Sequence, residues 1–226
     1  MFKIFSKGIN FFAGKSLQKR NIFLSSSLEY LQRTREINKN YFDYVRLATL
    51  ELVSVEINNK KLKGNVAELG VYKGKFASYI NLYFKERNLY LFDTFEGFDE
   101  RDVENEKKKG FSSGSQDFSD TSVDSVLSLM PYSKNCIPIK GFFPESAKNI
   151  QDEFVFVSID ADLYEPIYKG LSFFYKLLVP GGYIFIHDFN NDRYPGARKA
   201  VEQFCDENKI TFLPLPDSAG SAIICK

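Results

Sequence analysis

Residues 65–75 carry the sequence NVAELGVYKGK, in which a short apolar run is followed by two glycines. The run over 65–69 is typical of a buried strand, and the periodicity of 75–85 predicts a helix. Gly70 and Gly74 flank the turn between these elements, where the missing side chains let a ligand approach the backbone. The segment therefore predicts a strand–turn–helix unit with a binding site at its turn.

The alternation of short apolar runs and helical periodicity extends on both sides of this unit. Further strands are expected at 88–92, 136–139, 154–159 and 183–186, and further helices at 27–58, 122–130, 164–178 and 196–208. Strands that are apolar on both faces and are separated by helices indicate a parallel sheet covered on both sides. The last two strands, 210–213 and 221–225, are too close in sequence for a helical crossover and must form an antiparallel hairpin. The expected fold is α/β, with a mostly parallel sheet and helices on both faces.

Composition narrows the class of protein. The chain has 226 residues and a net charge of +1, so it forms one domain with a short appendage, and nucleic-acid binding through overall positive charge is disfavoured. Its three cysteines are widely spaced, which indicates no disulfide framework and favours a reducing compartment. No apolar run approaches the roughly 18 residues of a membrane span, and no secretory signal is evident. These features predict a cytoplasmic protein.

The amino terminus differs from the rest of the chain. Residues 1–28 hold five basic and no acidic residues, interleaved with phenylalanines. Such a segment can lie on an anionic membrane surface; it can equally be a frayed terminus or an arm that packs on a neighbouring subunit of a homo-oligomer. We expect an arm and helix over 1–40 and the main domain over 41–226.

Residues 97–121 interrupt the alternation with a charged, Gly/Ser-rich and aperiodic stretch. A loop of this length in a compact domain is usually a lid, a binding loop or a passive insertion. Because it follows the carboxyl end of a strand, where ligands bind in open α/β sheets, we expect a lid.

Two acidic residues near the glycine turn indicate the kind of ligand. Glu68 lies two residues before Gly70, and Asp93 ends the next strand. A carboxylate at the turn would repel a pyrophosphate but suits an ammonium or a sulfonium, and an acid at the second strand can bind a ribose diol. Together they predict S-adenosylmethionine. The missing GxGxxG argues against a nicotinamide oxidoreductase, and an ordinary turn with Glu68 paired to a lysine is the alternative.

A second group of polar residues follows strands 154–159 and 183–186. Asp160, His187 and Asp188 would converge at one edge of a parallel sheet, with Asp162 close by. Such residues can bind a divalent cation and leave positions for substrate, or His187 can act as a general base without a metal. The alternative for Asp160 or Asp162 is a cap on the following helix. In methyl transfer, a metal would lower the pKa of an acceptor hydroxyl and orient it.

Six segments that contain these residues resemble the macrocin O-methyltransferase family. They are Glu68–Gly74, Asp93–Phe98, Lys140–Pro144, Asp160–Pro166, Gly181–Tyr183 and 187–201, in the family's order within residues 41–226. The resemblance implies a seven-stranded, Rossmann-like class I methyltransferase fold. It also implies an enzyme that uses S-adenosylmethionine and Mg²⁺ to methylate sugar hydroxyls of glycosylated small molecules.

The resemblance also implies roles for individual residues. The cofactor contacts would come from Glu68, Gly70, Tyr72, Gly74, Asp93, Thr94, Phe95, Gly141, Phe142 and Asp160. The metal ligands would be Asp160, His187 and Asp188, with Asp160 and His187 as catalytic residues. Where His187 stands, family members usually carry an aspartate, and imidazole suits Mn²⁺ better than Mg²⁺. The acceptor, a glycan or another small molecule, is not encoded in a short motif, and a scaffold without activity remains an alternative.

Overall fold

The computed structural model describes residues 43–226, together with the single positions Gly8 and Ser16. The chain divides into two compact units, Met1–Phe42 and Asp43–Lys226, and the second is described below. The expected arm over 1–40, its membrane contact through 1–28 and the first part of the 27–58 helix lie outside the described residues. Among the helices that are described, none has the length and apolar character of a membrane span.

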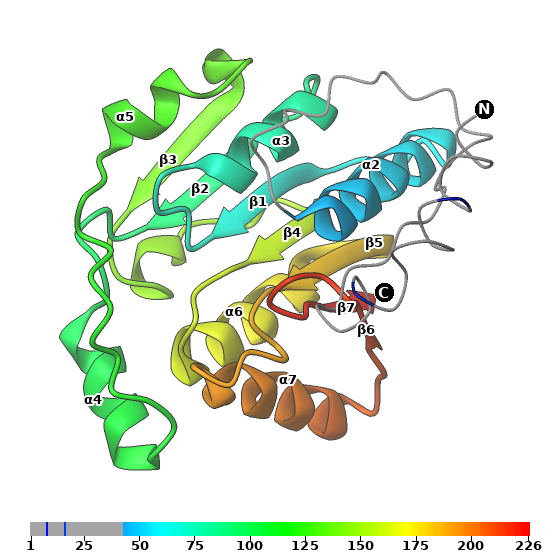
Figure 1. Ribbon diagram of the computed structural model, residues 1–226. Helices are drawn as coiled ribbons and strands as arrows, with labels where there is room; N and C mark the ends of the chain where they lie inside the picture. Colours follow the sequence, from blue (N-terminus) through cyan, green and yellow to red (C-terminus); the bar gives the residue numbers. More distant parts are fainter. Residues whose placement is uncertain (1–7, 9–15, 17–42) are drawn as a thin grey trace. The chain divides into compact units, whose positions relative to one another are not determined.

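The described unit is built on one seven-stranded sheet with the order β3-β2-β1-β4-β5-β7-β6 (Figure 1). The strands are β1 Asn65–Leu69, β2 Leu89–Asp93, β3 Cys136–Lys140, β4 Phe154–Ile159, β5 Leu178–Ile186, β6 Leu213–Pro214 and β7 Ala222–Cys225. The first five pair in parallel, and β7 pairs antiparallel with both β5 and β6. The predicted parallel sheet with an antiparallel terminal hairpin is confirmed.

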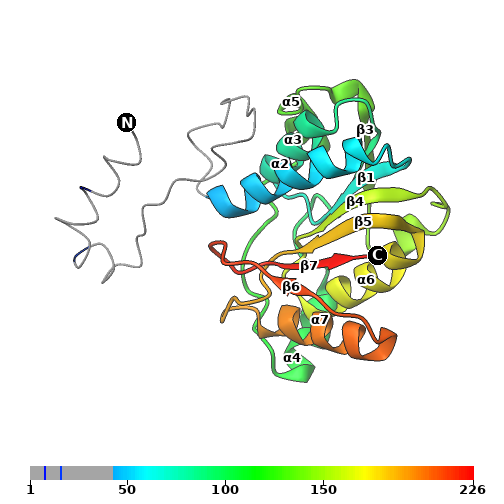
Figure 2. The same cartoon turned by 90° about the vertical axis from the view of Figure 1, so that its right-hand side faces the viewer.

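Helices cover both faces of the sheet. They are α2 Tyr44–Asn59, α3 Lys75–Tyr83, α4 Glu100–Lys109, α5 Val123–Ser128, α6 Tyr164–Leu177 and α7 Pro195–Asn208. Helices α2 and α3 lie on one face, and α6 and α7 lie on the other (Figure 2). This two-sided cover explains why five of the six residues of β4 are apolar, since all six are buried; the exception is Ser158.

The core beneath α6 is aromatic. The ring of Phe174 on α6 lies 5.5 Å from that of Phe92, 5.4 Å from that of Phe154 and 5.9 Å from that of Phe143. The contacts with Phe92 and Phe154 are edge-to-face, a geometry that aromatic pairs favour. One side chain therefore joins the helix to β2 and β4 and to the segment after β3.

The stretch over 97–121 differs from the predicted loop because it contains α4. Asp99 caps the first turn of α4 by accepting from the Arg101 amide, and Gly110 ends the helix with φ 70°. Its buried residues are Asp102 and Glu106, so a search for apolar periodicity does not find it. Two strands also differ clearly from their expected bounds. β5 begins at Leu178 instead of 183, and β6 consists of Leu213–Pro214 instead of 210–213.

Truncation of Phe174 tests the aromatic core. We expect Phe174→Ala to lower the free energy of unfolding by about 3–5 kcal/mol, because it removes a fully buried ring and leaves a cavity. Urea denaturation measures the change. Leu129→Ala is the control, since Leu129 is 55% exposed and its truncation should change stability by less than about 0.5 kcal/mol. Equal losses in the two variants would contradict the assignment.

Candidate active site

The register of the sheet brings the ends of β1, β4 and β5 to one edge. Leu69 lies opposite Ile159, and Ile159 lies opposite Ile186. The Asp160 amide donates to the Leu69 carbonyl over 2.8 Å, and the His187 amide donates to the Ile159 carbonyl over 2.9 Å. The residues that follow these strands therefore share one edge, as predicted.

Gly70 lies against the backbone of the neighbouring strand end. Its φ is +83°, and a Cβ at this position would lie 2.1 Å from the carbonyl oxygen of Asp160. Both facts require glycine, because an L-residue would be strained and would also overlap a backbone atom. The first turn and the acidic residues after β4 are therefore in direct contact.

The three predicted metal-ligating residues lie together. Nδ1 of His187 is 3.0 Å from Oδ1 of Asp160 and 2.8 Å from Oδ2 of Asp188. Ligand atoms from all three residues lie within 4.8 Å of one another. The structure thus brings these side chains together, and their roles in metal binding and catalysis stay predictions.

Ion pairing determines the charges in this cluster. Burial alone would raise the pKa of Asp160, but His187 and Arg46 hold it well below its usual range. Burial alone would lower the pKa of His187, but the carboxylates of Asp160 and Asp188 raise it to about 10. Without a cation, His187 is therefore protonated at neutral pH and Asp160 is ionised.

Arg46 of α2 is a member of the site that the sequence analysis missed. Its Nη1 donates to Oδ2 of Asp160 over 3.0 Å and its Nη2 to Oγ of Ser158 over 3.2 Å, and its guanidinium lies 3.8 Å from the centroid of the Phe76 ring. A charged residue is rarely buried without a partner. The available signal in the sequence was an arginine on the apolar face of a helix. That signal does not identify the partner, because Asp160 is 114 residues away in the chain.

Glu68 is a buried carboxylate with an unused oxygen. The residue is 1% exposed, and its Oε2 has no hydrogen-bond partner within the described residues. No lysine there forms an ion pair with it, so the alternative of a Glu68–lysine pair is not found. Burial raises the pKa of Glu68 to about 8, and the charge of Asp160 adds to the rise. A bound ammonium group would satisfy this oxygen.

Asp93 holds the glycine turn in place. Its Oδ2 accepts from the amides of Val71 and Tyr72 over 2.7 and 2.9 Å, and its Oδ1 accepts from the Phe95 amide over 2.6 Å. A carboxylate has about four acceptor positions, so these bonds leave little capacity for a ribose diol. Asp93 thus anchors the turn, and its contact with ribose stays a prediction.

The backbone at this edge is strained in several places. Four residues other than glycine have positive φ after the ends of β1, β2, β4 and β5, namely Tyr72 (48°), Phe95 (54°), Asp162 (56°) and Asp188 (60°). Such conformations persist only where the surrounding structure enforces them, and they cluster at functional sites. The strain supports a binding site at this edge.

Of the remaining predicted cofactor residues, Gly74 precedes the first residue of α3 with φ 72°, and the others lie after β2 and β3. Thr94 Oγ1 donates to the Gly97 carbonyl over 2.5 Å, and the Gly141 amide donates to the Asp93 carbonyl over 3.0 Å. The guanidinium of Arg101 lies 3.5 Å from the centroid of the Phe142 ring. Helix α4 therefore covers one face of a ring that we expect near the adenosine.

Helix α4 is also tied to α6. The amide of Tyr164 donates to Oε2 of Glu106 over 2.9 Å, and Glu106 is 1% exposed.

No side chain of Asp160 or Asp162 caps α6, so the cap alternative for these two residues is wrong. Burial, with the charges of Asp188 and Asp160, instead raises the pKa of Asp162 well above its usual range.

The sheet order and its antiparallel end strands are those of the class I methyltransferases. The fold is similar to that of the O-methyltransferase NovP, with a TM-score of 0.65 and 17% identity over 80% of this chain and 79% of that chain. For the calicheamicin methyltransferase CalS11 the TM-score is 0.63 and the identity is 19%, over 80% of this chain and 78% of that chain. For an O-methyltransferase from Bacillus cereus in complex with SAH the TM-score is 0.51 and the identity is 14%, over 79% of this chain and 81% of that chain.

Residues 39–217 match the family described as Macrocin-O-methyltransferase (TylF), and the chain belongs to this family. It is accordingly an O-methyltransferase that depends on S-adenosylmethionine, as the resemblance implied. The membership favours methyl transfer over the nicotinamide oxidoreductase and the inactive scaffold that the sequence left open. The comparison with curated proteins gave no match.

Substitution of Gly70 tests the contact between the turn and Asp160. We expect Gly70→Ala to weaken binding of S-adenosylhomocysteine at least tenfold, because the new methyl group overlaps the Asp160 carbonyl. Isothermal titration calorimetry measures the affinity. Gly110→Ala is the matched control, since Gly110 also has positive φ (+70°) but no atom within 4 Å of the added Cβ. Unchanged affinity in Gly70→Ala would refute the close approach.

The protonation of His187 predicts how stability depends on pH in chelator-treated protein. A pKa raised from 6.5 to about 10 stabilises the fold fully below pH 6.5 and loses this effect as pH rises to 10. The stability advantage of the wild type over His187→Gln should therefore shrink across this window, by at most about 1.4 kcal/mol per pH unit. Urea denaturation at several pH values measures it, and an advantage that grows with pH would overturn the assignment.

Proposed function

We propose that the protein transfers a methyl group from S-adenosylmethionine to a hydroxyl of a sugar or a glycosylated small molecule, assisted by a divalent cation. One observation carries the proposal. The Asp160–His187–Asp188 cluster adjoins the glycine turn and the buried Glu68 carboxylate. The family supports the reaction class, and one solved structure of the same fold, CalS11, is described as a TDP-rhamnose 3'-O-methyltransferase.

The cofactor's charged end fits the carboxylate of Glu68. Its free Oε2 can accept from the ammonium group, and the positive sulfonium lowers the cost of the negative charge at this edge. Gly70 leaves the turn without a side chain where the cofactor would pass. Asp93 keeps this turn in shape through the amides of Val71 and Tyr72.

The donor set fits a divalent cation. Two carboxylates and one imidazole approach a common point, and Nδ1 of His187 already donates toward both carboxylates. A cation at this point would replace the proton on Nδ1, so its affinity should rise with pH. When bound, it would lower the pKa of the acceptor hydroxyl. Imidazole in the set favours Mn²⁺ over Mg²⁺.

The protonation state of His187 argues against the alternative in which His187 acts as a general base without a metal. A general base must be unprotonated at the working pH. The two carboxylates raise the pKa of His187 to about 10, so without a cation its imidazole holds its proton at neutral pH. Arg46 and His187 keep Asp160 ionised, which suits a cation ligand and an electrostatic partner of the sulfonium.

A chelator experiment distinguishes metal-assisted methyl transfer from transfer with His187 as a metal-free base. We expect EDTA to abolish methyl transfer and Mn²⁺ to restore it more effectively than Mg²⁺. His187→Asp should stay active and shift the preference toward Mg²⁺, because a third carboxylate suits the harder ion. His187→Ala should lose most of its metal affinity. Initial rates with radiolabelled S-adenosylmethionine over a panel of sugars and glycosides measure these effects. Turnover that resists EDTA but disappears in His187→Ala would establish the histidine as base.

A further inference from the structure

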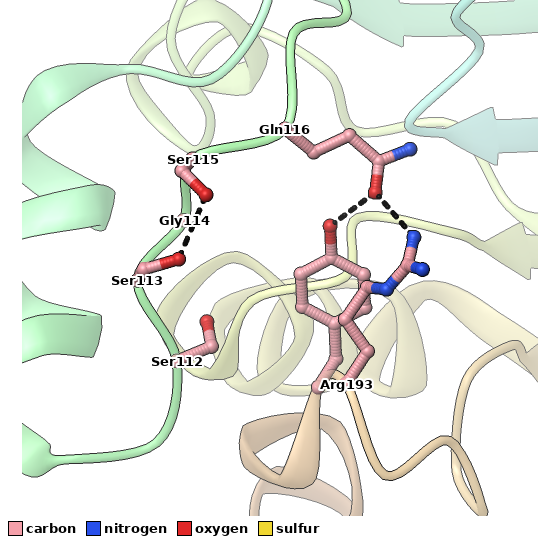
Figure 3. A pocket seen from close by; sticks show the side chains of 7 residues that line it. Ser112, Ser113, Gly114, Ser115, Gln116 and Arg193 are labelled. Atoms are coloured by element: carbon pink, nitrogen blue, oxygen red, sulfur yellow. Dashed lines mark hydrogen bonds between the residues drawn. The ribbon is translucent and has the colours of Figure 1, made fainter.

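A polar pocket lies between the segment after α4 and the loop after β5 (Figure 3). Residues 112–116, Arg193 and Tyr194 line it, and its volume is about 420 Å³, within the range of small-molecule sites. Oε1 of Gln116 accepts from the Tyr194 hydroxyl over 2.8 Å and from Nη1 of Arg193 over 3.2 Å. These two bonds join the walls of the pocket.

Arg193 brings a positive charge that no carboxylate of the described residues neutralises. Its side chain bonds to the neutral amide of Gln116. The other arginines of residues 43–226 are engaged differently. Arg46, Arg101 and Arg198 pair with carboxylates, and Arg87 donates to two backbone carbonyls. The Arg193 guanidinium therefore keeps donors for a ligand in the pocket.

The rest of the lining suits an anion. Ser112, Ser113 and Ser115 place hydroxyl groups on the wall that faces Arg193, and no acidic residue lines the pocket (Figure 3). Oγ of Ser113 and Oγ of Ser115 lie 2.8 Å apart. The Ser112 hydroxyl donates to Oε1 of Glu106 over 3.3 Å, so the hydroxyl donor beside the guanidinium comes from the Ser113–Ser115 pair. A hydroxyl donor and a guanidinium match the oxygens of a phosphate, to which arginine binds in a bidentate manner. A neutral sugar ring would leave the charge of the guanidinium without a counter-charge.

Asn191 connects the pocket to the acidic cluster. Its Nδ2 donates to Oδ1 of Asp188 over 2.6 Å, and its Oδ1 accepts from the Arg193 amide over 3.0 Å. Its carbonyl accepts from the Tyr194 amide over 3.0 Å. These bonds hold the backbone that carries Arg193 relative to Asp188, which favours a defined placement of an acceptor for in-line attack on the methyl group.

We propose that this pocket binds a phosphate of the acceptor, so that the substrate is a phosphorylated sugar, such as a nucleoside diphosphate sugar or a sugar 1-phosphate. The inference rests on the proposed methyl transfer to a sugar hydroxyl and narrows its substrate class. The pocket holds the phosphate, and the sugar extends toward Asp188.

Binding of inorganic pyrophosphate and of UDP to the full chain tests the pocket without turnover. We expect calorimetry to show binding to the wild type and at least tenfold weaker binding to Arg193→Gln. Lys199→Gln is the matched control, because it removes the same charge from the neighbouring helix α7, where Lys199 pairs with Glu202 outside the pocket. Its affinity should change less than twofold. No binding to the wild type, or equal losses in both variants, would overturn the proposal.

Turnover measurements distinguish a nucleotide sugar from a sugar 1-phosphate as the acceptor. The acceptors are one hexose presented as its UDP derivative, as its 1-phosphate and as its neutral methyl glycoside. Arg193→Gln should raise KM at least tenfold for the phosphorylated acceptors and leave KM for S-adenosylmethionine unchanged. Preference for the UDP derivative assigns a nucleotide sugar, and equal use of the 1-phosphate assigns the phosphate alone. Preference for the neutral glycoside would overturn the inference. Arg193-dependent binding of pyrophosphate without methyl transfer to any acceptor would refute the proposed function instead.

Discussion

The contact between Gly70 and the backbone of Asp160 determines the geometry of the whole site. It joins the ends of β1 and β4 so closely that a side chain at position 70 would overlap a carbonyl group. Because β5 continues the same register, His187 and Asp188 reach the same edge. Asp93 secures the turn from the other side through two backbone amides. The glycine turn and the acidic cluster therefore lie at one edge of the sheet.

The main electrostatic property of this edge is that carboxyl groups outnumber cationic side chains. The carboxyl groups of Glu68, Asp160, Asp162 and Asp188 share the edge with Arg46 and His187. Without ligands, protonation relieves the repulsion, since burial raises the pKa of Glu68 to about 8 and that of Asp162 well above its usual range. A sulfonium, an ammonium and a divalent cation would each relieve it instead. The proposed ligands of this edge are thus positive and would take the place of protons on its carboxyl groups. In the Arg193 pocket the protein group is positive and the proposed ligand is negative.

Helix α4 is anchored by polar contacts. Its buried face carries Asp102 and Glu106, and Glu106 accepts from the first amide of α6. Arg101 on the same helix covers the Phe142 ring. These contacts are made with parts of the chain that also border the site. Movement of α4 would therefore change the cap of α6 and the environment of Phe142 together.

The sequence by itself determined the order of the strands and of the helices other than α4, the glycine turn and the sharing of one edge by Glu68, Asp160, His187 and Asp188. It could do so because these features follow from local periodicity and from the rule that parallel strands end at the same side of a sheet. Only the tertiary structure decided that Arg46 pairs with Asp160, that Glu106 caps α6 and that Gln116 meets Arg193. Each of these contacts joins groups far apart in the chain. Their meeting depends on how helices and loops pack on the sheet, and no local pattern records that packing.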